Sequence, residues 1–174
     1  LVEGKATDPF CATYGAATSQ RWARYVNHSG RPAVVFDLNV VGTNASYQLE
    51  GLRRFEADGV PIELIEFGNE LYAWQQNGGK WSDGAGYAKA MRPYLAAMQA
   101  AFPKAKTAVV GSGWWPRMDS NWNKAVLANT TATAATSHFY TELFTSGITA
   151  ATVAARARPL LNQAFVTAKQ WQID

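Results

Sequence analysis

The sequence is poor in the residues that build disulfide frameworks and metal centres. Cys11 is the only cysteine among 174 residues, so an internal disulfide framework is excluded. A thiolate zinc cluster is excluded as well, because it needs several sulfurs at short spacing. The two histidines, His28 and His138, lie far apart in the sequence and form no metal-binding motif. We therefore expect no metal site.

Charge excess and long apolar runs are also missing. The net charge is only +3, and the Lys and Arg residues are scattered rather than gathered in a stripe, which argues against a nucleic-acid-binding surface. No apolar run reaches the roughly 20 residues that a membrane helix needs. Hydrophobic residues make up 48% of the chain, as in ordinary globular domains. We expect a globular protein with no membrane span and no nucleic-acid partner.

Sequons and aromatic residues are what the chain has in excess. It carries three N-glycosylation triplets, at Asn27, Asn44 and Asn129, which together favour an extracellular or secretory-pathway location. It has no signal-like segment and no initiator Met, and it begins as if processed or partial. The seven Trp and seven Tyr residues are explained either by core packing or by platforms on which sugar rings stack.

Short apolar strands alternate with amphipathic helices along the chain. The strands are runs rich in β-branched residues, and the helices repeat apolar residues at a spacing of 3.6. We expect strands at 33–40, 62–67, 106–111, 134–140 and 170–174. We expect helices at 44–58, 87–102, 121–127 and 149–169, of which the second and the fourth contain a proline. Pro93 marks either a late start or a kink of its helix.

This alternation predicts an α/β fold with a parallel sheet and right-handed crossovers. Such a sheet is either doubly wound or a (β/α)8 TIM barrel. A barrel needs at least about 200 residues, and this chain holds about five of its eight units. Five units alone would leave open sheet edges, which folded proteins avoid. We therefore expect residues 1–174 to be a single domain that is part of a barrel, completed by further segments or by a partner chain.

Glu70 is the main candidate for a catalytic group. It ends the run Gly68-Asn69-Glu70 directly after the second predicted strand, and the carboxyl ends of barrel strands build active sites. A Glu there can protonate a leaving oxygen when its neighbours raise its pKa, and Asn69 can hold a sugar hydroxyl. Glu63 and Glu66 precede the end of the strand, so we interpret them as structural or rim residues.

His138 and Tyr140 end the fourth predicted strand. They are two residues apart and therefore face the same way. A lone His is more often a core residue than a catalytic one, but this pair accompanies a Gly-Asn-Glu run. Asn39 ends the first predicted strand, where it either lines the same pocket or serves the turn. We take all three, with Asn69, as candidate substrate-binding residues.

These motifs together resemble the core of the clan A retaining glycoside hydrolases, and most of all the heparanase-like family of endo-β-glucuronidases. Members carry a Phe-x-Leu-Asn strand, a Gly-Asn-Glu strand and a His-x-Tyr strand in this order. The resemblance covers roughly residues 33–174. It implies that the visible strands are the third to the seventh of the barrel. It also implies that Glu70 is the acid/base, that Asn69 contacts the substrate and that Tyr140 bonds the nucleophile.

The resemblance also implies a second carboxylate. Retaining glycosidases need two carboxyl groups about 5–5.5 Å apart, and the family places a Glu three residues after a Trp on the seventh strand. Here Trp171 is followed at that spacing by Asp174. Asp is one methylene shorter than Glu, and a misplacement of that order can cost about 10²-fold in rate. Either Asp174 is the nucleophile, or a Glu lies beyond it, or the nucleophile is lost.

Two other catalytic motifs are excluded. Gly111-Ser112-Gly113 follows a strand but lacks the third glycine and the acidic residue of a dinucleotide-binding site. No Gly-x-Ser-x-Gly elbow is present for a serine hydrolase. The sequence therefore favours a cofactor-free glycoside hydrolase that acts on a β-linked polysaccharide, with uronic-acid-containing chains among the candidates. The alternatives are a non-catalytic barrel remnant, acting as a glycan-binding or structural extracellular subunit, and a doubly wound sheet with an unrelated ligand.

Overall fold

The computed structural model describes residues 17–112, 120–138, 149, 151–152, 154–155, 158–159 and 162. Helices and strands alternate through the first two of these ranges. In chain order they are α1 (Ala17–His28), β1 (Val35–Asp37), α2 (Ala45–Ala57), β2 (Leu64–Glu66), α3 (Trp74–Asn77), α4 (Gly84–Ala101), β3 (Lys106–Val110), α5 (Ser120–Ala128) and β4 (Ala134–Thr136).

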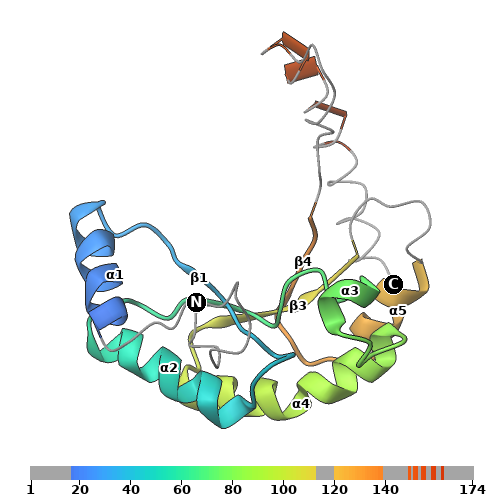
Figure 1. The fold of residues 1–174 in the computed structure, drawn as a ribbon, viewed down its shortest axis with the longest axis horizontal. Helices are drawn as coiled ribbons and strands as arrows, with labels where there is room; N and C mark the ends of the chain where they lie inside the picture. Colours follow the sequence, from blue (N-terminus) through green and yellow to red (C-terminus); the bar gives the residue numbers. More distant parts are fainter. Residues whose placement is uncertain are drawn as a thin grey trace.

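The four strands form one parallel sheet in the order β1-β2-β3-β4. Each new strand is added on the same side of the previous one. A doubly wound sheet would instead reverse its strand order at a switch point, so the described strands exclude that alternative. The helices α1, α2, α4 and α5 follow an arc around one side of the sheet (Figure 1). The predicted partial (β/α)8 barrel is confirmed.

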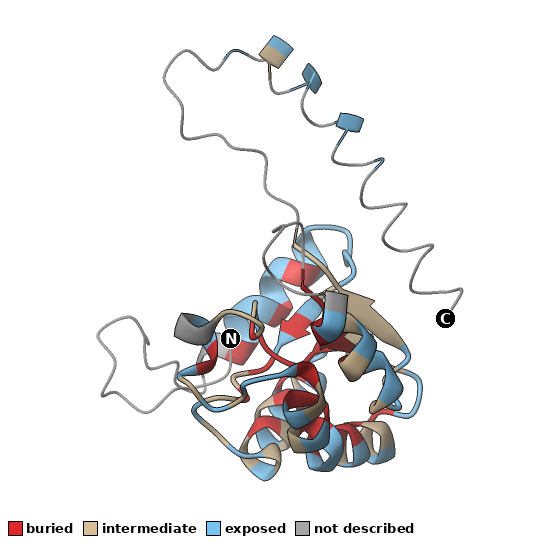
Figure 2. Ribbon diagram, turned by 90° about the vertical axis from the view of Figure 1, so that its right-hand side faces the viewer, coloured by how far each residue is buried: buried red, intermediate tan, exposed pale blue. Residues whose placement is uncertain are grey.

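The core lies between the sheet and the helices. Phe36 and Ile65, which are register partners on β1 and β2, are 3% and 0% exposed. Val35, which points to the opposite face, is 51% exposed. Figure 2 shows the buried residues gathered where the helices meet the sheet. The face away from the helices is the one that points into a closed barrel.

Helix α4 is longer than the sequence pattern predicted. It begins at Gly84, three residues before the predicted start, because Asp83 caps it by accepting a hydrogen bond of 2.7 Å from the Gly86 N–H. Pro93 lies inside the helix, so it does not mark a late start. Gly84 is required for packing against α5, since a Cβ there would lie 2.3 Å from the Trp122 carbonyl oxygen.

The other predicted strands and helices agree with the structure in position but differ from it in length. All four described strands fall inside their predicted ranges, but each is only three to five residues long. No element was predicted where α1 lies. The predicted fifth strand at 170–174 lies outside the described residues, as does most of the predicted helix at 149–169.

Within the part of the chain that the structure describes, no helix is long and apolar enough to cross a membrane.

Candidate active site

Polar side chains gather at the carboxyl ends of β1, β2 and β4, on the face that the helices leave uncovered. They contact one another through hydrogen bonds, close carboxylate–imidazole contacts and electrostatic interactions. This strand-end cluster consists of Asp37, Glu66, Glu70, Tyr72, Thr136 and His138. It lies where barrel enzymes build their active sites.

The backbone turn after β2 directs Glu70 into the cluster. Gly68 has φ +93°, and a Cβ there would lie 2.4 Å from Leu71 Cδ1. Glu70 itself has φ +50°, a left-handed conformation that costs a non-glycine residue about 1–2 kcal/mol. The Ala73 N–H closes the turn with a hydrogen bond of 2.9 Å to the Glu70 carbonyl oxygen. Strain of this kind is concentrated at functional sites in proteins.

Two buried polar side chains fix the backbone of this turn and of the neighbouring strand ends through hydrogen bonds. Asn77 is 1% exposed, and its Nδ2 donates to the carbonyl oxygens of Leu71, at 3.0 Å, and Trp81, at 2.9 Å. The Tyr87 hydroxyl donates to the Phe67 carbonyl oxygen at 2.8 Å and accepts from the Val110 N–H at 3.1 Å. Burial raises the pKa of Tyr87, so this hydroxyl stays protonated. The ends of β2 and β3 are thereby fixed to α4.

Oε1 of the Glu70 carboxyl group contacts two neighbouring side chains. Oε1 lies 3.3 Å from Nδ1 of His138 and accepts a hydrogen bond of 3.3 Å from the Tyr72 hydroxyl. The Glu70 side chain is 17% exposed and that of His138 is 34% exposed. Both groups are thus held in place and remain partly exposed to solvent. This is the arrangement that a general acid needs.

Glu66 belongs to the cluster, so its interpretation as a structural or rim residue is incomplete. Its Oε1 accepts a hydrogen bond of 2.5 Å from the Thr136 hydroxyl and lies 3.9 Å from Nε2 of His138. The residue is 8% exposed. Its side chain therefore points along the sheet toward β4 and links β2 to the strand that carries His138.

Asp37 and Glu66 place two carboxyl groups side by side. They are register partners on adjacent strands, and such partners project from the same face of a sheet. The pKa of Asp37 is raised to about 6, first by burial of its carboxyl group and then by the Glu66 carboxylate, although the residue keeps some exposed surface. The Gly68 N–H and His138 partly oppose this shift. The Asp37 carboxyl group can therefore keep its proton up to about pH 6.

The structure separates the remaining predicted site residues. Asn69 is exposed beside Glu70, in a position to reach a ligand. Asn39 is half-buried, and its Oδ1 accepts a hydrogen bond of 2.8 Å from the Gly42 N–H, so the turn accounts for this side chain. Tyr140 and Asp174 lie outside the described residues. Substrate contact by these residues, and the nucleophile role of Asp174, stay predictions.

Sequence reasoning missed Asp37, Tyr72 and Thr136 as members of the cluster. A signal for the first was present, because an acidic residue inside a short apolar strand needs a reason to be there. Thr136 precedes His138 by two residues and therefore shares its face. Tyr72 follows Glu70 at the same spacing, but in a turn, where spacing does not predict direction.

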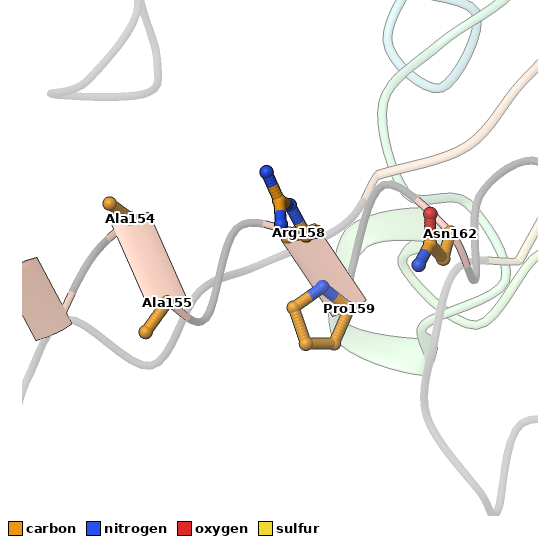
Figure 3. Close-up of a pocket in the computed structure, with 5 residues that line it drawn as sticks. All are labelled: Ala154, Ala155, Arg158, Pro159 and Asn162. Carbon is orange, nitrogen blue, oxygen red and sulfur yellow. The ribbon is translucent and has the colours of Figure 1, made fainter.

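No metal centre competes with the cluster in the described part of the chain. No group of three or more His, Cys, Asp or Glu residues there could hold a metal ion. A hollow of about 450 Å³ runs along one stretch of backbone and is lined by Ala154, Ala155, Arg158, Pro159 and Asn162 (Figure 3). No strand and no residue of the strand-end cluster lines it, so it is not part of the candidate site.

Comparison with known proteins shows which solved structures have a fold similar to that of this chain. No protein-family model and no curated protein matches the chain. Among the solved structures that match it in fold are three α-L-arabinofuranosidases. AbfB, a family 51 α-L-arabinofuranosidase from Bifidobacterium longum, matches with a TM-score of 0.64 at 18% identity. The thermostable GH51 α-L-arabinofuranosidase from Thermotoga petrophila matches with a TM-score of 0.65 at 21% identity.

The third structure is the arabinose complex of the α-L-arabinofuranosidase from Thermotoga maritima, with a TM-score of 0.64 at 21% identity. The matches cover 86%, 86% and 91% of this chain and 33%, 32% and 33% of the three structures, in the order given. The chain therefore spans about a third of the length of each structure. The chain is part of a TIM barrel. Its fold is similar to that of part of the GH51 α-L-arabinofuranosidase structures, and these matches give no specific support to the heparanase-like family.

Proposed function

We propose that this chain is part of the catalytic barrel of a retaining glycoside hydrolase, with Glu70 as its acid/base. One observation carries the proposal. The Glu70 carboxyl group is held in a left-handed turn at the end of β2, with Oε1 3.3 Å from His138. A strained, partly buried carboxyl group at the strand ends of a glycosidase-type barrel is suited to proton transfer.

The reaction has two steps, and Glu70 acts in both. In the first, its carboxyl group donates a proton to the glycosidic oxygen as the bond to the anomeric carbon breaks and a carboxylate nucleophile attacks that carbon. In the second, the Glu70 carboxylate takes a proton from water, which displaces the nucleophile and restores the free enzyme. His138 and Tyr72 orient Oε1 throughout.

The nucleophile is proposed to be Asp174 or a Glu that follows it, with Tyr140 as its hydrogen-bond partner. This assignment is supported by the spacing from Trp171 and by the requirement for two carboxyl groups about 5–5.5 Å apart. Labelling with a slow fluorinated glycoside, followed by mass spectrometry, identifies the esterified residue. We expect label at Asp174 or just beyond it, and label elsewhere would refute the assignment.

Two substrate classes are proposed for comparison. The sequence motifs favour a β-linked polysaccharide, including one with uronic acid residues. The structural likeness favours an α-L-arabinofuranoside, since the three matched structures are arabinofuranosidases. The described cluster carries three carboxyl groups, from Asp37, Glu66 and Glu70, which would repel an acidic sugar. We therefore expect turnover of phenyl α-L-arabinofuranoside to exceed turnover of phenyl β-glucuronide.

The test of catalysis is Glu70→Gln in the protein that carries this chain at its natural length. Without the acid, kcat/KM should fall by about 10²–10⁴-fold for a phenyl glycoside and far less for a dinitrophenyl glycoside, whose leaving group needs no proton. Glu63→Gln is the matched control, because Glu63 is exposed just before β2. Full activity of Glu70→Gln on the phenyl glycoside would refute the acid/base assignment. Glycan binding without turnover by the wild type would instead favour the barrel remnant.

An extracellular location is part of this proposal. It is supported by the exposure of Asn27, on α1, and of Asn44, which caps α2. Asn129 is less suited to a glycan, because its Nδ2 donates a hydrogen bond of 2.8 Å to the Ala125 carbonyl oxygen. We expect N-glycosidase treatment of the secreted protein to lower its apparent mass. The unchanged mass of a protein recovered only inside cells would argue against this location.

A further inference from the structure

The two ring nitrogens of His138 each face a carboxylate, one on β2 and one on the turn that follows β2. Nδ1 lies 3.3 Å from Oε1 of Glu70, and Nε2 lies 3.9 Å from Oε1 of Glu66. A protonated imidazole donates from both nitrogens, whereas a neutral ring donates from only one. The ring therefore spans the candidate acid/base and a second carboxylate that comes four residues earlier in the chain.

The position of Glu66 is fixed by its surroundings. The Thr136 hydroxyl donates to Glu66 Oε1 at 2.5 Å, and Thr136 precedes His138 by two residues on the same face of the sheet. Glu66 is 8% exposed and lies within β2, before the turn that carries Glu70. It is thus placed to contact His138 rather than a sugar.

Other ionisable groups surround the same ring and carboxylates. Asp37 on β1 interacts electrostatically with Glu66 and His138. Tyr72 contacts Glu70 from the turn after β2, and Tyr87 on α4 lies close enough to Glu66 for the carboxylate to raise its pKa. These carboxyl groups and hydroxyls are the other titratable groups that face the ring and its two carboxylates.

We propose that Glu66 is a positioning residue for the acid step. Its carboxylate, held by Thr136, orients the His138 imidazole, and that ring holds the Glu70 carboxyl group in line with the leaving oxygen. Glu66 exchanges no proton with the substrate, so no step of the reaction is added. The inference rests on the proposed role of Glu70 and deepens it.

The test compares leaving groups in the protein that carries this chain at its natural length. Glu66→Gln keeps the shape and the acceptor for Thr136 but removes the charge. We expect kcat/KM to fall by roughly 10-fold for phenyl α-L-arabinofuranoside and by less than about 2-fold for the dinitrophenyl glycoside, because only the first needs a well-placed proton. A merely structural role would lower both values equally. Equal losses, or no loss, would overturn the inference.

Three further variants separate the possible causes. Thr136→Val removes the hydroxyl that holds Glu66 while keeping both carboxylates, and it should give a smaller selective loss of about 3-fold. It also serves if Glu66→Gln does not fold. Glu63→Gln should leave both substrates unchanged, and a selective loss there would overturn the specific role of Glu66. If Glu70→Gln itself shows no selective loss, the proposed function fails. If only Glu66→Gln and Thr136→Val show none, this inference alone fails.

Discussion

At the scale of single residues, the main feature of the site is that three carboxyl groups lie close together. Asp37, Glu66 and Glu70 meet within one cluster, and His138 separates two of them. The sequence predicted Glu70 and His138 because each ends a strand. It could not predict that Glu66 turns toward β4, because that direction depends on the Thr136 hydroxyl and on the register of strands far apart in the chain.

The raised pKa of Asp37 predicts a change of stability with pH. The folded protein keeps this proton up to about pH 6, whereas the unfolded chain loses it near its usual pKa of about 3.9. Between these values the folded state binds more protons, so the free energy of unfolding falls as pH rises. Asp37→Asn should remove this loss and gain on the order of 1 kcal/mol at pH 7, discounted for partial exposure.

Thermal unfolding of Asp37→Asn and of the wild type at pH 4 and pH 7 checks the prediction. The difference in Tm should grow from the lower pH to the higher one. Glu56→Gln, on an exposed part of α2, is the control and should show no such trend. A difference that shrinks with rising pH would contradict the assigned direction of the Asp37 shift.

At the scale of elements, the sequence patterns predicted which helices and strands exist better than they predicted where each one begins and ends. Apolar runs located the four described strands, because a strand buried against helices must be apolar. They gave strands that are too long, since residues such as Asn39 and Phe67 belong to turns whose hydrogen bonds no period reveals. Helix α1 was missed, and α4 was started late because the Asp83 cap was overlooked.

The turn after β2 is the element that positions Glu70 most directly. Gly68→Ala would place a methyl group 2.4 Å from Leu71 Cδ1 at a φ of +93°. We expect a loss of about 1–3 kcal/mol in the free energy of unfolding and reduced kcat/KM, because Glu70 would be displaced. Gly59→Ala is a matched control, with φ +86° and no atom within 4 Å of the added Cβ.

Urea unfolding and phenyl glycoside kinetics together separate these effects. Gly59→Ala should lose stability through backbone strain alone and keep its kcat/KM. Gly68→Ala should lose more stability and also lose activity. Equal behaviour of the two variants would show that close packing at Gly68 does not position Glu70.

At the scale of the whole molecule, the described strands form part of a TIM barrel. The alternation of strands and helices predicted this, and the strand order confirmed it. The sequence could not decide the substrate, because in barrel enzymes the loops that follow the strands select the ligand. The face of β1 that points into the barrel is open here, with Val35 51% exposed.

Closure of the barrel has a consequence for Val35. In the protein at its natural length this side chain should be buried inside the barrel, so Val35→Asp should lower the free energy of unfolding by about 2–4 kcal/mol. Arg53→Asp, on an exposed part of α2, should change it by less than about 1 kcal/mol. Chemical denaturation of both variants measures this, and a neutral Val35→Asp would show that the barrel does not close over β1.

The most direct test of the central claim is azide rescue of Glu70→Ala on a dinitrophenyl glycoside. The activated substrate still forms the glycosyl-enzyme, but water then lacks its general base. Azide needs no base, so it should attack the anomeric carbon, release the enzyme carboxylate and raise kcat by at least roughly 10-fold. We expect a glycosyl azide with the configuration of the substrate, identified by NMR. Unchanged kcat and no glycosyl azide would contradict the acid/base role of Glu70.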